Sequence, residues 1–208
     1  HWTRDVVELL LARDDVDVNS KNNSRDTPLY HAARAGQEAV VKLLLARDNI
    51  DVNSQARSGD TPLHYAARAG QEAVVKLLLA RDGINVNSKD HFGNTPLHCA
   101  ARAGQEAVAK LLLARDGINI NSKDQFGNTP LHNAAEAGQE AVVELLLARD
   151  DINVNPKDRS GNTPLHYAAR AGLEAVVKLL LAREDIDVNL ENILGHTPLL
   201  IAGGNKVI

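Results

Sequence analysis

The stretch TPLHCAARAGQEAVAKLLL, residues 95–113, decides the fold. Its opening Thr-Pro-Leu recurs at residues 27, 61, 95, 129, 163 and 197, always 34 residues apart. Self-similarity at a fixed period of this length is the signature of a repeat array. Residues 61–94 and 95–128 agree at 30 of 34 positions. The sequence therefore predicts one array of tandem units and not two unrelated domains.

The register of Thr-Pro-Leu predicts the boundaries of the units within a single domain, residues 1–208. We expect a half unit at 1–26, full units at 27–60, 61–94, 95–128, 129–162 and 163–196, and a half unit at 197–208. The first half unit holds only the second helix of a unit, and the last holds only the first helix. Because the chain begins at His1 and has no methionine, we expect it to be a piece of a longer protein.

The first half of each full unit carries the signals of a short helix. Thr95 is a favourable N-cap, and Pro96 suits the first helical position. Leu97 and Ala100 lie on one apolar stripe. Gly104 adopts a left-handed conformation readily, so we expect the helix to end there after about two turns.

The second half of the unit predicts another helix and a loop. Glu106 suits a helix start, where the macrodipole favours an anion. Val108, Leu111 and Leu112 form a second apolar stripe, and residues 121–128 are polar and turn-forming. One unit is too small to bury these side chains by itself, so neighbouring units must stack into a solenoid.

Composition excludes several classes of function. The net charge is −4, and 3% of the 208 residues are aromatic, which disfavours nucleic acid, anionic membranes and base stacking. No apolar run approaches the about 18 residues of a membrane span. Cys99 is the single cysteine, so an intrachain disulfide cannot form. We expect a reducing, intracellular and cytoplasmic location.

The pattern Thr-Pro-Leu-His-x-Ala-Ala-x-x-Gly, followed by Val-Val-Lys-Leu-Leu-Leu and Val-Asn, resembles the ankyrin repeat over nearly the whole chain. The resemblance is strongest in residues 61–94, 95–128 and 163–196. It implies an all-α solenoid of stacked helix–turn–helix units with projecting β-hairpin loops. It also implies a non-catalytic scaffold without a cofactor, which binds a protein or peptide through its hairpin tips and its concave inner-helix face.

The sequence departs from the ankyrin pattern in its period and in its first hairpin. The period is 34 residues, whereas the family's usual period is about 33. Nearly uniform arrays of this kind resemble those of fungal multidomain proteins or a consensus-built scaffold. A structural spacer or regulatory arm of a larger protein, or an engineered consensus-like scaffold, is therefore the alternative function. Arg25 stands where Gly59 and Gly93 stand in later hairpins, so we expect an irregular first hairpin.

The histidines and Cys99 are interpreted as structural, and no catalytic or metal-binding residue is predicted. Stacked helices lie about 8–10 Å apart, which is too far for the equivalent His64, His98 and His132 to share a metal. The resemblance gives this histidine a structural hydrogen-bonding role. Cys99 follows His98 directly, and consecutive helical residues do not face each other. The repeated asparagines at positions such as Asn53 are interpreted as turn residues that satisfy backbone groups.

Differences between units mark positions that packing leaves free, and they concentrate in the hairpins. The expected partner-binding residues at the hairpins are Arg57, Ser58, His91, Phe92, Gln125, Phe126 and Arg159. Aromatic side chains on a polar rim are typical interface anchors. Drift, or rings folded onto the next hairpin, is the alternative interpretation of the phenylalanines.

A second set of expected partner-binding residues follows Ala-Ala on the inner helices. This slot holds Arg34, Arg68, Arg102, Glu136 and Arg170. The expected partner-binding residues among them are Arg68, Arg102, Glu136 and Arg170. Four arginines one repeat apart favour an acidic protein or peptide as the partner. In the alternative interpretation, the arginines are solvated and held by nearby aspartates, namely Asp90, Asp124 and Asp158.

Apolar residues accumulate toward the C-terminal end of the sequence. They are Leu173, Leu190, Ile193, Leu194, Leu199, Leu200, Ile201, Val207 and Ile208. A free terminal unit is expected to have a polar outer face. Either the array continues in a longer chain, or this end self-associates by docking on another copy.

Overall fold

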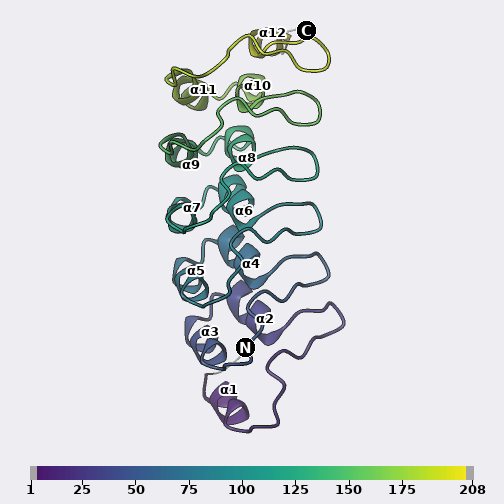
Figure 1. The fold of residues 1–208 in the computed structure, drawn as a ribbon, viewed down its shortest axis with the longest axis vertical. Helices are drawn as coiled ribbons and strands as arrows, with labels where there is room; N and C mark the ends of the chain where they lie inside the picture. The colour runs from purple at the N-terminus through teal and green to yellow at the C-terminus, as the bar shows by residue number, and fades with distance from the viewer. Residues whose placement is uncertain (1–3, 205–208) are drawn as a thin grey trace.

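Two parallel columns of helices form the molecule (Figure 1). The computed structural model describes residues 4–204. The inner column is α2 (Pro28–Arg34), α4 (Pro62–Ala69), α6 (Pro96–Ala103), α8 (Pro130–Glu136), α10 (Pro164–Ala171) and α12 (Pro198–Gly204). The outer column is α1 (Arg4–Leu11), α3 (Glu38–Leu45), α5 (Glu72–Leu79), α7 (Glu106–Leu113), α9 (Glu140–Leu147) and α11 (Glu174–Leu181). The predicted all-α solenoid is confirmed. Its projecting loops contain turns and no strand within residues 4–204.

Local signals account for the limits of the helices. Thr95 has an extended backbone and its hydroxyl accepts the amide hydrogen of His98, which makes it the N-cap of α6. Gly104 has φ 68° and ends the same helix, as predicted. Glu106 is the first residue of α7 and favours the positive end of the helix macrodipole.

The core lies between the two columns and runs the length of the array. Leu97 of α6 and Leu112 of α7 are fully buried, and the equivalent leucines of the other internal units are also buried. Ala100 and Ala101 are fully buried on the inner column. Because alanine is small, neighbouring inner helices pack closely and every unit depends on the next for burial.

Asparagines join each unit to the next through what we call the asparagine clamp. Asn53 donates from its amide nitrogen to the carbonyl of Gly83 (2.8 Å), and its amide oxygen accepts from the backbone N–H of Asn85 (2.9 Å). The same pair of bonds is made by Asn19, Asn87, Asn121 and Asn155. These side chains therefore satisfy the backbone of the following unit, whereas the sequence indicated a local turn.

The projecting loops are held in register by their own aspartates and by each other. The Asp90 carboxylate accepts the backbone N–H groups of Phe92 and Asn94, both at 2.8 Å. The N–H of Gln125 donates to the carbonyl of Phe92 in the preceding loop (2.8 Å). These hydrogen bonds consequently fix the backbone conformation at the tip of each loop.

The first loop is regular, and the prediction that Arg25 disturbs it is wrong. The Arg25 N–H donates to the carbonyl of Asn22 at 2.8 Å, as that of Gly93 does to Asp90 at 2.9 Å. Arg25 achieves this with φ 64°, and it is the one non-glycine residue with positive φ within residues 4–204. The turn persists because the remaining bonds of the loop determine its shape, and the strain falls on Arg25.

Arg25→Gly is expected to stabilise the first loop, in the half unit 1–26, by about 1 kcal/mol, since glycine removes the left-handed strain but loses some backbone entropy. Chemical denaturation measures this change. Gly93→Ala is the reverse control, because a Cβ at Gly93 would lie 2.9 Å from the backbone nitrogen of Gln125. A destabilised Arg25→Gly variant would contradict the assignment of strain.

Candidate functional site

The tips of the loops present the two phenylalanines of the chain to solvent. Phe92 and Phe126 occupy equivalent tips, and each is 55% exposed. Their backbone N–H groups are fixed by Asp90 and Asp124, both at 2.8 Å. The rings are thus carried on an ordered backbone while more than half of their surface faces water, in contrast to the alternative of rings folded away on the next loop.

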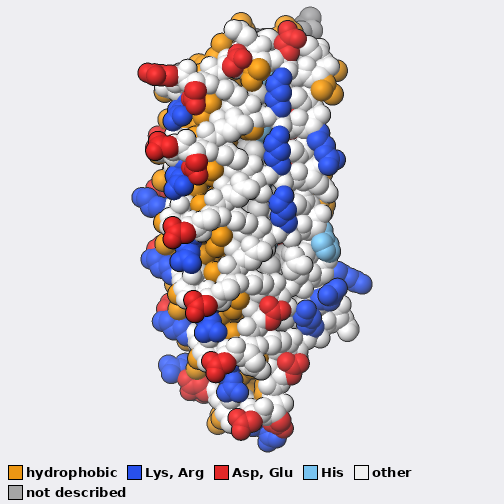
Figure 2. All heavy atoms as spheres, in the orientation of Figure 1, with side chains coloured by type: hydrophobic (Ala, Val, Ile, Leu, Met, Phe, Trp, Pro, Cys, Tyr) orange, Lys and Arg blue, Asp and Glu red, His pale blue; other side chains and the backbone are white. Residues whose placement is uncertain are grey.

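The polar residues predicted beside the rings differ in their exposure to solvent. Arg57, His91 and Arg159 are exposed, whereas Gln125 is only half-exposed. The Ser58 hydroxyl donates to Asp60 at 2.7 Å, so it stabilises its own loop. We call the seven residues Arg57, Ser58, His91, Phe92, Gln125, Phe126 and Arg159 the tip patch. Cationic side chains are visible along the loop side of the molecule (Figure 2).

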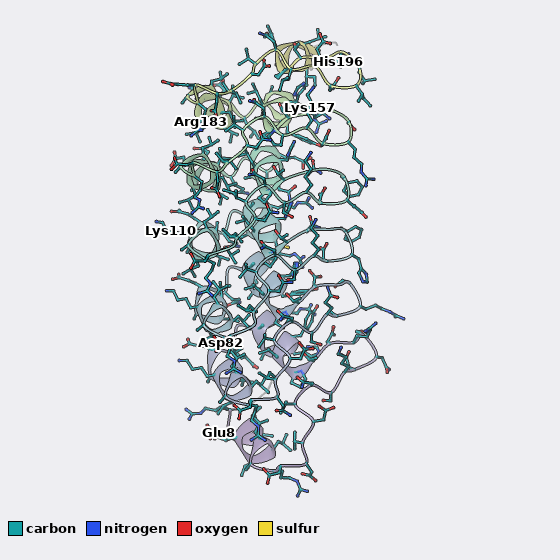
Figure 3. All side chains as sticks on the ribbon, viewed as in Figure 1. Glu8, Asp82, Lys110, Lys157, Arg183 and His196 are labelled. Atoms are coloured by element: carbon teal, nitrogen blue, oxygen red, sulfur yellow. The ribbon has the colours of Figure 1, made fainter. Side chains whose placement is uncertain are left out.

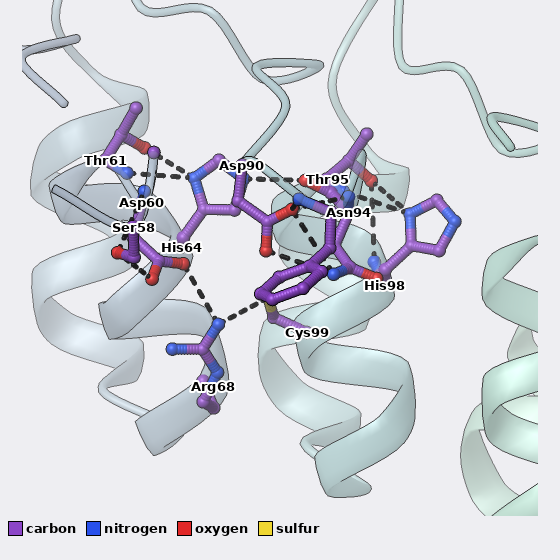
Figure 4. A network of polar contacts seen from close by, with 12 residues as sticks. Ser58, Asp60, Thr61, His64, Arg68, Asp90, Asn94, Thr95, His98 and Cys99 are labelled. Atoms are coloured by element: carbon purple, nitrogen blue, oxygen red, sulfur yellow. Dashed lines mark hydrogen bonds and ion pairs between the residues drawn. The ribbon is translucent and has the colours of Figure 1, made fainter. Parts of the chain in front are cut away.

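The second predicted set, which we call the arginine stripe, consists of Arg34, Arg68, Arg102 and Arg170, with Glu136 in the fourth of its five places. The Arg68 guanidinium donates to Asp60 (3.0 Å) and to the sulfur of Cys99 (3.3 Å) (Figure 4). Arg102 donates to the amide oxygen of Asn133 at 3.2 Å. Both guanidinium groups therefore reach along the array toward the next inner helix.

The remaining members of the arginine stripe lie near tyrosine rings. The guanidinium of Arg34 is 5.6 Å from the Tyr65 ring centre, and that of Arg170 is 4.7 Å from Tyr167. Arg170 also lies 4.0 Å from the carboxylate of Glu136. A guanidinium over an aromatic face is attracted by the ring and is oriented by it.

The interpretation in which Asp90 and Asp124 hold the arginines is wrong for Arg68 and Arg102, which donate to Asp60 and Asn133. The carboxylates of Asp90, Asp124 and Asp158 each accept backbone N–H groups of their own loop. Arg68 pairs instead with Asp60, at the base of the loop. The equivalent of Asp60 in the next loop is Asn94, which explains why Arg102 lacks this ion pair. The Arg68–Asp60 contact also makes the arginine stripe continuous with the base of the loops.

The equivalent histidines lie inside the array and join the start of each inner helix to the end of the loop that leads to the next inner helix. His98 accepts the N–H of Thr95 on its Nδ1 at 3.1 Å, and its Nε2–H donates to the carbonyl of Asn128 at 3.1 Å. His64, His132 and His166 make the same bonds (Figure 4 shows His64 beside Thr61). Burial lowers the pKa of His98 to about 4, so the ring is neutral at pH 7. The structural role implied by the resemblance is confirmed.

Cys99 is buried among these groups and is not activated. Burial raises the pKa of its thiol to about 11, which outweighs the opposing effect of Arg68. A protonated thiol is a poor nucleophile. His98 directs its ring nitrogens to Thr95 and Asn128, so it does not serve as a base for Cys99. Among residues 4–204, no three His, Cys, Asp or Glu side chains are grouped to hold a metal ion.

Lysines of successive loops form a series of hydrogen bonds that the sequence analysis did not predict, and we call this series the lysine ladder. Lys89 donates from Nζ to the carbonyl of Lys123 (2.8 Å), Lys123 to that of Lys157 (2.9 Å), and Lys157 to that of Glu191 (2.8 Å). Figure 3 labels Lys157 on the loop side, opposite Lys110 and Arg183 of the outer side. The signal in the sequence is the recurrence of lysine every 34 residues from Lys89 to Lys157.

The apolar residues near the C-terminal end differ in how far they are buried. Ile193, Leu194, Leu199 and Leu200 are exposed. Leu173 is half-buried and packs over Gly138, so it belongs to the edge of the core and not to the apolar end. Leu190 and Ile201 are half-buried. Val207 and Ile208 lie outside the described residues.

The family of the chain follows from the comparison with family models. A model described as "Ankyrin repeats (3 copies)" matches residues 3–90, 49–124, 83–158, 117–192 and 152–206. The chain belongs to the ankyrin repeat family. Ankyrin repeats are generally non-catalytic protein-interaction modules. The comparison with curated proteins found no match. Within residues 4–204, the helices of this ankyrin array lack the length and apolar character that crossing a bilayer requires.

Proposed function

We propose that this ankyrin array is a recognition scaffold that binds an acidic protein or peptide through the tip patch and the arginine stripe. The observation that carries the proposal is the pair of exposed rings, Phe92 and Phe126, at equivalent tips. Aromatic side chains on a polar rim dominate the binding energy of many interfaces. Their fixed backbone reduces the entropy that is lost on binding.

The arginine stripe supplies the preference for an acidic partner. Arg34, Arg68 and Arg102 lie on three successive inner helices, and all three are exposed. Planar guanidinium groups bind carboxylates through two parallel hydrogen bonds. Glu136 interrupts the positive charge after Arg102, so the acidic segment is expected to lie over the first three inner helices of the stripe.

Loss of the rings tests the tip patch. The double variant Phe92→Ala, Phe126→Ala is expected to abolish capture of partners from a cell lysate and to leave the melting midpoint within a few degrees. Both rings are largely exposed, so their removal affects binding far more than folding. Lys110→Ala, on the opposite outer column, is the matched control and is expected to retain capture. Unchanged capture by the double variant would refute a role for the tips.

Charge reversal at the gap in the stripe tests the preference for acidic partners. Glu136→Arg extends the positive charge to a fourth helix and is expected to tighten binding of an acidic partner several-fold at low salt, with the gain lost in high salt. Surface plasmon resonance across a salt series measures the effect. An unchanged affinity would show that the stripe is solvated and does not contact the partner.

A structural spacer or regulatory arm of a larger protein is the second candidate function. The near-identity of residues 61–94 and 95–128 favours it, because a spacer requires length without a distinctive face. This alternative predicts no specific capture by the unmodified chain, whereas the recognition scaffold predicts capture that depends on the two rings.

A further inference from the structure

At α4, a tyrosine ring contacts two members of the arginine stripe. The guanidinium of Arg34, from the preceding inner helix, lies over the Tyr65 ring at 5.6 Å from its centre. The guanidinium of Arg68, from α4 itself, lies over the same ring at 5.0 Å from its centre. A cation within about 6 Å of a ring centre is attracted by the face of the ring. The Tyr65 ring therefore joins the arginines of two successive inner helices.

At α6, the equivalent place is a hollow. Cys99 holds the repeat position of Tyr65, and a cavity of about 160 Å³ opens beside it. We call this cavity the Cys99 hollow, and it is lined by Arg68, Asn94, His98, Cys99, Arg102 and Ala103. Arg68 and Arg102 hold the same repeat positions around this hollow that Arg34 and Arg68 hold around the tyrosine of α4. Two arginines are thus in place at α6 without the ring that they contact at α4.

The hollow follows from the small side chain of Cys99. The five full units carry His31, Tyr65, Cys99, Asn133 and Tyr167 at this position, and cysteine is the smallest of these residues. At α10, the Tyr167 ring lies 4.7 Å from the guanidinium of Arg170, and its hydroxyl donates to Asp158 at 2.8 Å. Arg68 reaches into the space that a tyrosine would occupy at α6, where it donates to the Cys99 sulfur at 3.3 Å (Figure 4).

The Cys99 hollow suits an aromatic ring in its size and in its lining. An apolar cavity of about 150 Å³ accommodates benzene. The Cys99 hollow has a similar volume, about 160 Å³, and its walls are mostly apolar. Arg102 and Ala103 are exposed, so the hollow is open to solvent. A ring that enters from outside can therefore bury its edge and keep a guanidinium on its face.

We propose that the Cys99 hollow receives an aromatic side chain of the partner, whose ring packs against Arg68 and Arg102 as the Tyr65 ring packs against its two arginines. This inference rests on the proposed recognition function and names a side chain that the partner supplies. The partner completes at α6 the arrangement that the array builds for itself at α4.

Nearby carboxylates favour an uncharged ring over an anion in the Cys99 hollow. Arg68 already pairs with the Asp60 carboxylate at 3.0 Å. Asn94, which lines the hollow, donates from its amide nitrogen to Asp90 at 3.0 Å. An anion in the hollow would lie near both negative charges, whereas a neutral ring is not repelled. The acidic groups of the partner are then left to the exposed guanidinium groups outside the hollow.

The hollow and the tip patch belong to the same loop. Asn94 follows Phe92 by two residues, so the hollow lies at the base of the loop whose tip carries the Phe92 ring. One segment of the partner can therefore contact the tip and the hollow together. Residues 61–94 and 95–128 differ at only four positions, and the exchange of Tyr65 for Cys99 is one of them.

Titration with p-cresol, which is the tyrosine side chain as a separate molecule, tests the hollow. In NMR spectra of the full chain, the backbone N–H signals of Cys99 and Ala103 are expected to shift, with a dissociation constant in the millimolar range. The N–H signal of Lys110, on the outer column, is the internal control and is expected to stay in place. Absence of a shift at Cys99 and Ala103 would overturn the proposal.

Cys99→Tyr fills the hollow with the residue that α4 carries at this position. It is expected to weaken p-cresol binding at least about tenfold and to leave the melting midpoint within a few degrees, because the same residue is accommodated at α4. Cys99→Ala is the matched control, since it keeps the hollow open, and it is expected to bind p-cresol like the unmodified chain. Equal binding by Cys99→Tyr and Cys99→Ala would overturn the proposal.

Arg102→Gln keeps the proposal testable if Cys99→Tyr disturbs α6. This variant removes a guanidinium that lines the hollow and keeps the cavity open. It is expected to raise the dissociation constant of p-cresol about threefold, as loss of an exposed cation–π contact does. An unchanged constant would overturn the packing of the ring on Arg102. Sodium acetate is the parallel probe, and shifts at Cys99 and Ala103 with acetate but not with p-cresol would overturn the proposal in favour of an anion site.

The inference and the proposed function fail in different experiments. Capture of partners that depends on Phe92 and Phe126 but persists in Cys99→Tyr would overturn the use of the hollow and leave the recognition scaffold standing. A chain that binds p-cresol in the hollow but captures no partner would overturn the recognition scaffold, and the hollow would remain a site for an aromatic ring.

Discussion

Lowering the pH from 7 to 4 is expected to remove about 6 kcal/mol from the free energy of unfolding, which is comparable with the whole stability of many domains. His98 and His132 account for this loss. Burial lowers the pKa of each imidazole from 6.5 to about 4 in the folded array. A shift of this size is worth about 3 kcal/mol for each ring.

The direction of the pH effect follows from proton uptake. Between pH 6.5 and 4, the unfolded chain binds protons on His98 and His132 while the folded array keeps both rings neutral. The unfolded state therefore binds more protons, and stability falls as the pH falls through this window. The contribution of the two neutral rings to stability is fully present above pH 6.5. A protonated Nδ1 also cannot accept the threonine N–H that caps the helix.

Denaturant titrations at several pH values between 7 and 4 measure the effect. His98→Gln and His132→Gln are each expected to flatten the pH dependence, because an amide does not titrate in this range. His91→Gln is the matched control, since it makes the same substitution at an exposed loop tip, away from the buried bonds of His98 and His132. A slope that is the same in all three variants would contradict the role of the buried rings.

Loss of an internal asparagine clamp is expected to cost about 2 kcal/mol, which is the effect of two hydrogen bonds whose backbone partners are left unpaired. Asn121→Ala removes the bonds to the carbonyl of Asp151 (2.7 Å) and to the N–H of Asn153 (2.9 Å). Chemical denaturation measures the change.

Asn189→Ala is the control for this measurement because it makes the same substitution at an equivalent repeat position, for which the pair of clamp bonds is not found within residues 4–204. It is expected to leave the free energy of unfolding within about 0.5 kcal/mol. Equal destabilisation by Asn121→Ala and Asn189→Ala would show that the side chain acts within its own turn, as the sequence first indicated, and not between units.

The helices and the exposed rings were predictable because their signals are local. Thr95, Gly104 and Glu106 favour the start or the end of a helix because of their own side chains or backbone freedom, and this preference does not depend on distant residues. The exposure of Phe92 followed from a comparison of units, because a position that varies while the fold is repeated is not required for packing.

Contacts between units were not predictable, because a side chain does not reveal which neighbouring carbonyl it will meet. Asn53 and Lys89 both bond to the backbone of the following unit, and only their recurrence every 34 residues hints at this. The partner of Arg68 was misassigned for a similar reason. The Asp90 carboxylate accepts hydrogen bonds from its own loop, and Arg68 pairs with the carboxylate of Asp60 instead.

Every clamp bond, every ladder bond and every bond from a histidine Nε2 joins residues 30 to 34 positions apart in the chain, and none of these bonds within residues 4–204 connects distant units. A pulling force applied along the stack is therefore borne in series, and the interface with the weakest bonds opens first. Such a chain yields in steps and re-forms rapidly when released, because each step needs only contacts of short sequence separation. The interfaces between units are therefore expected to open one at a time under load.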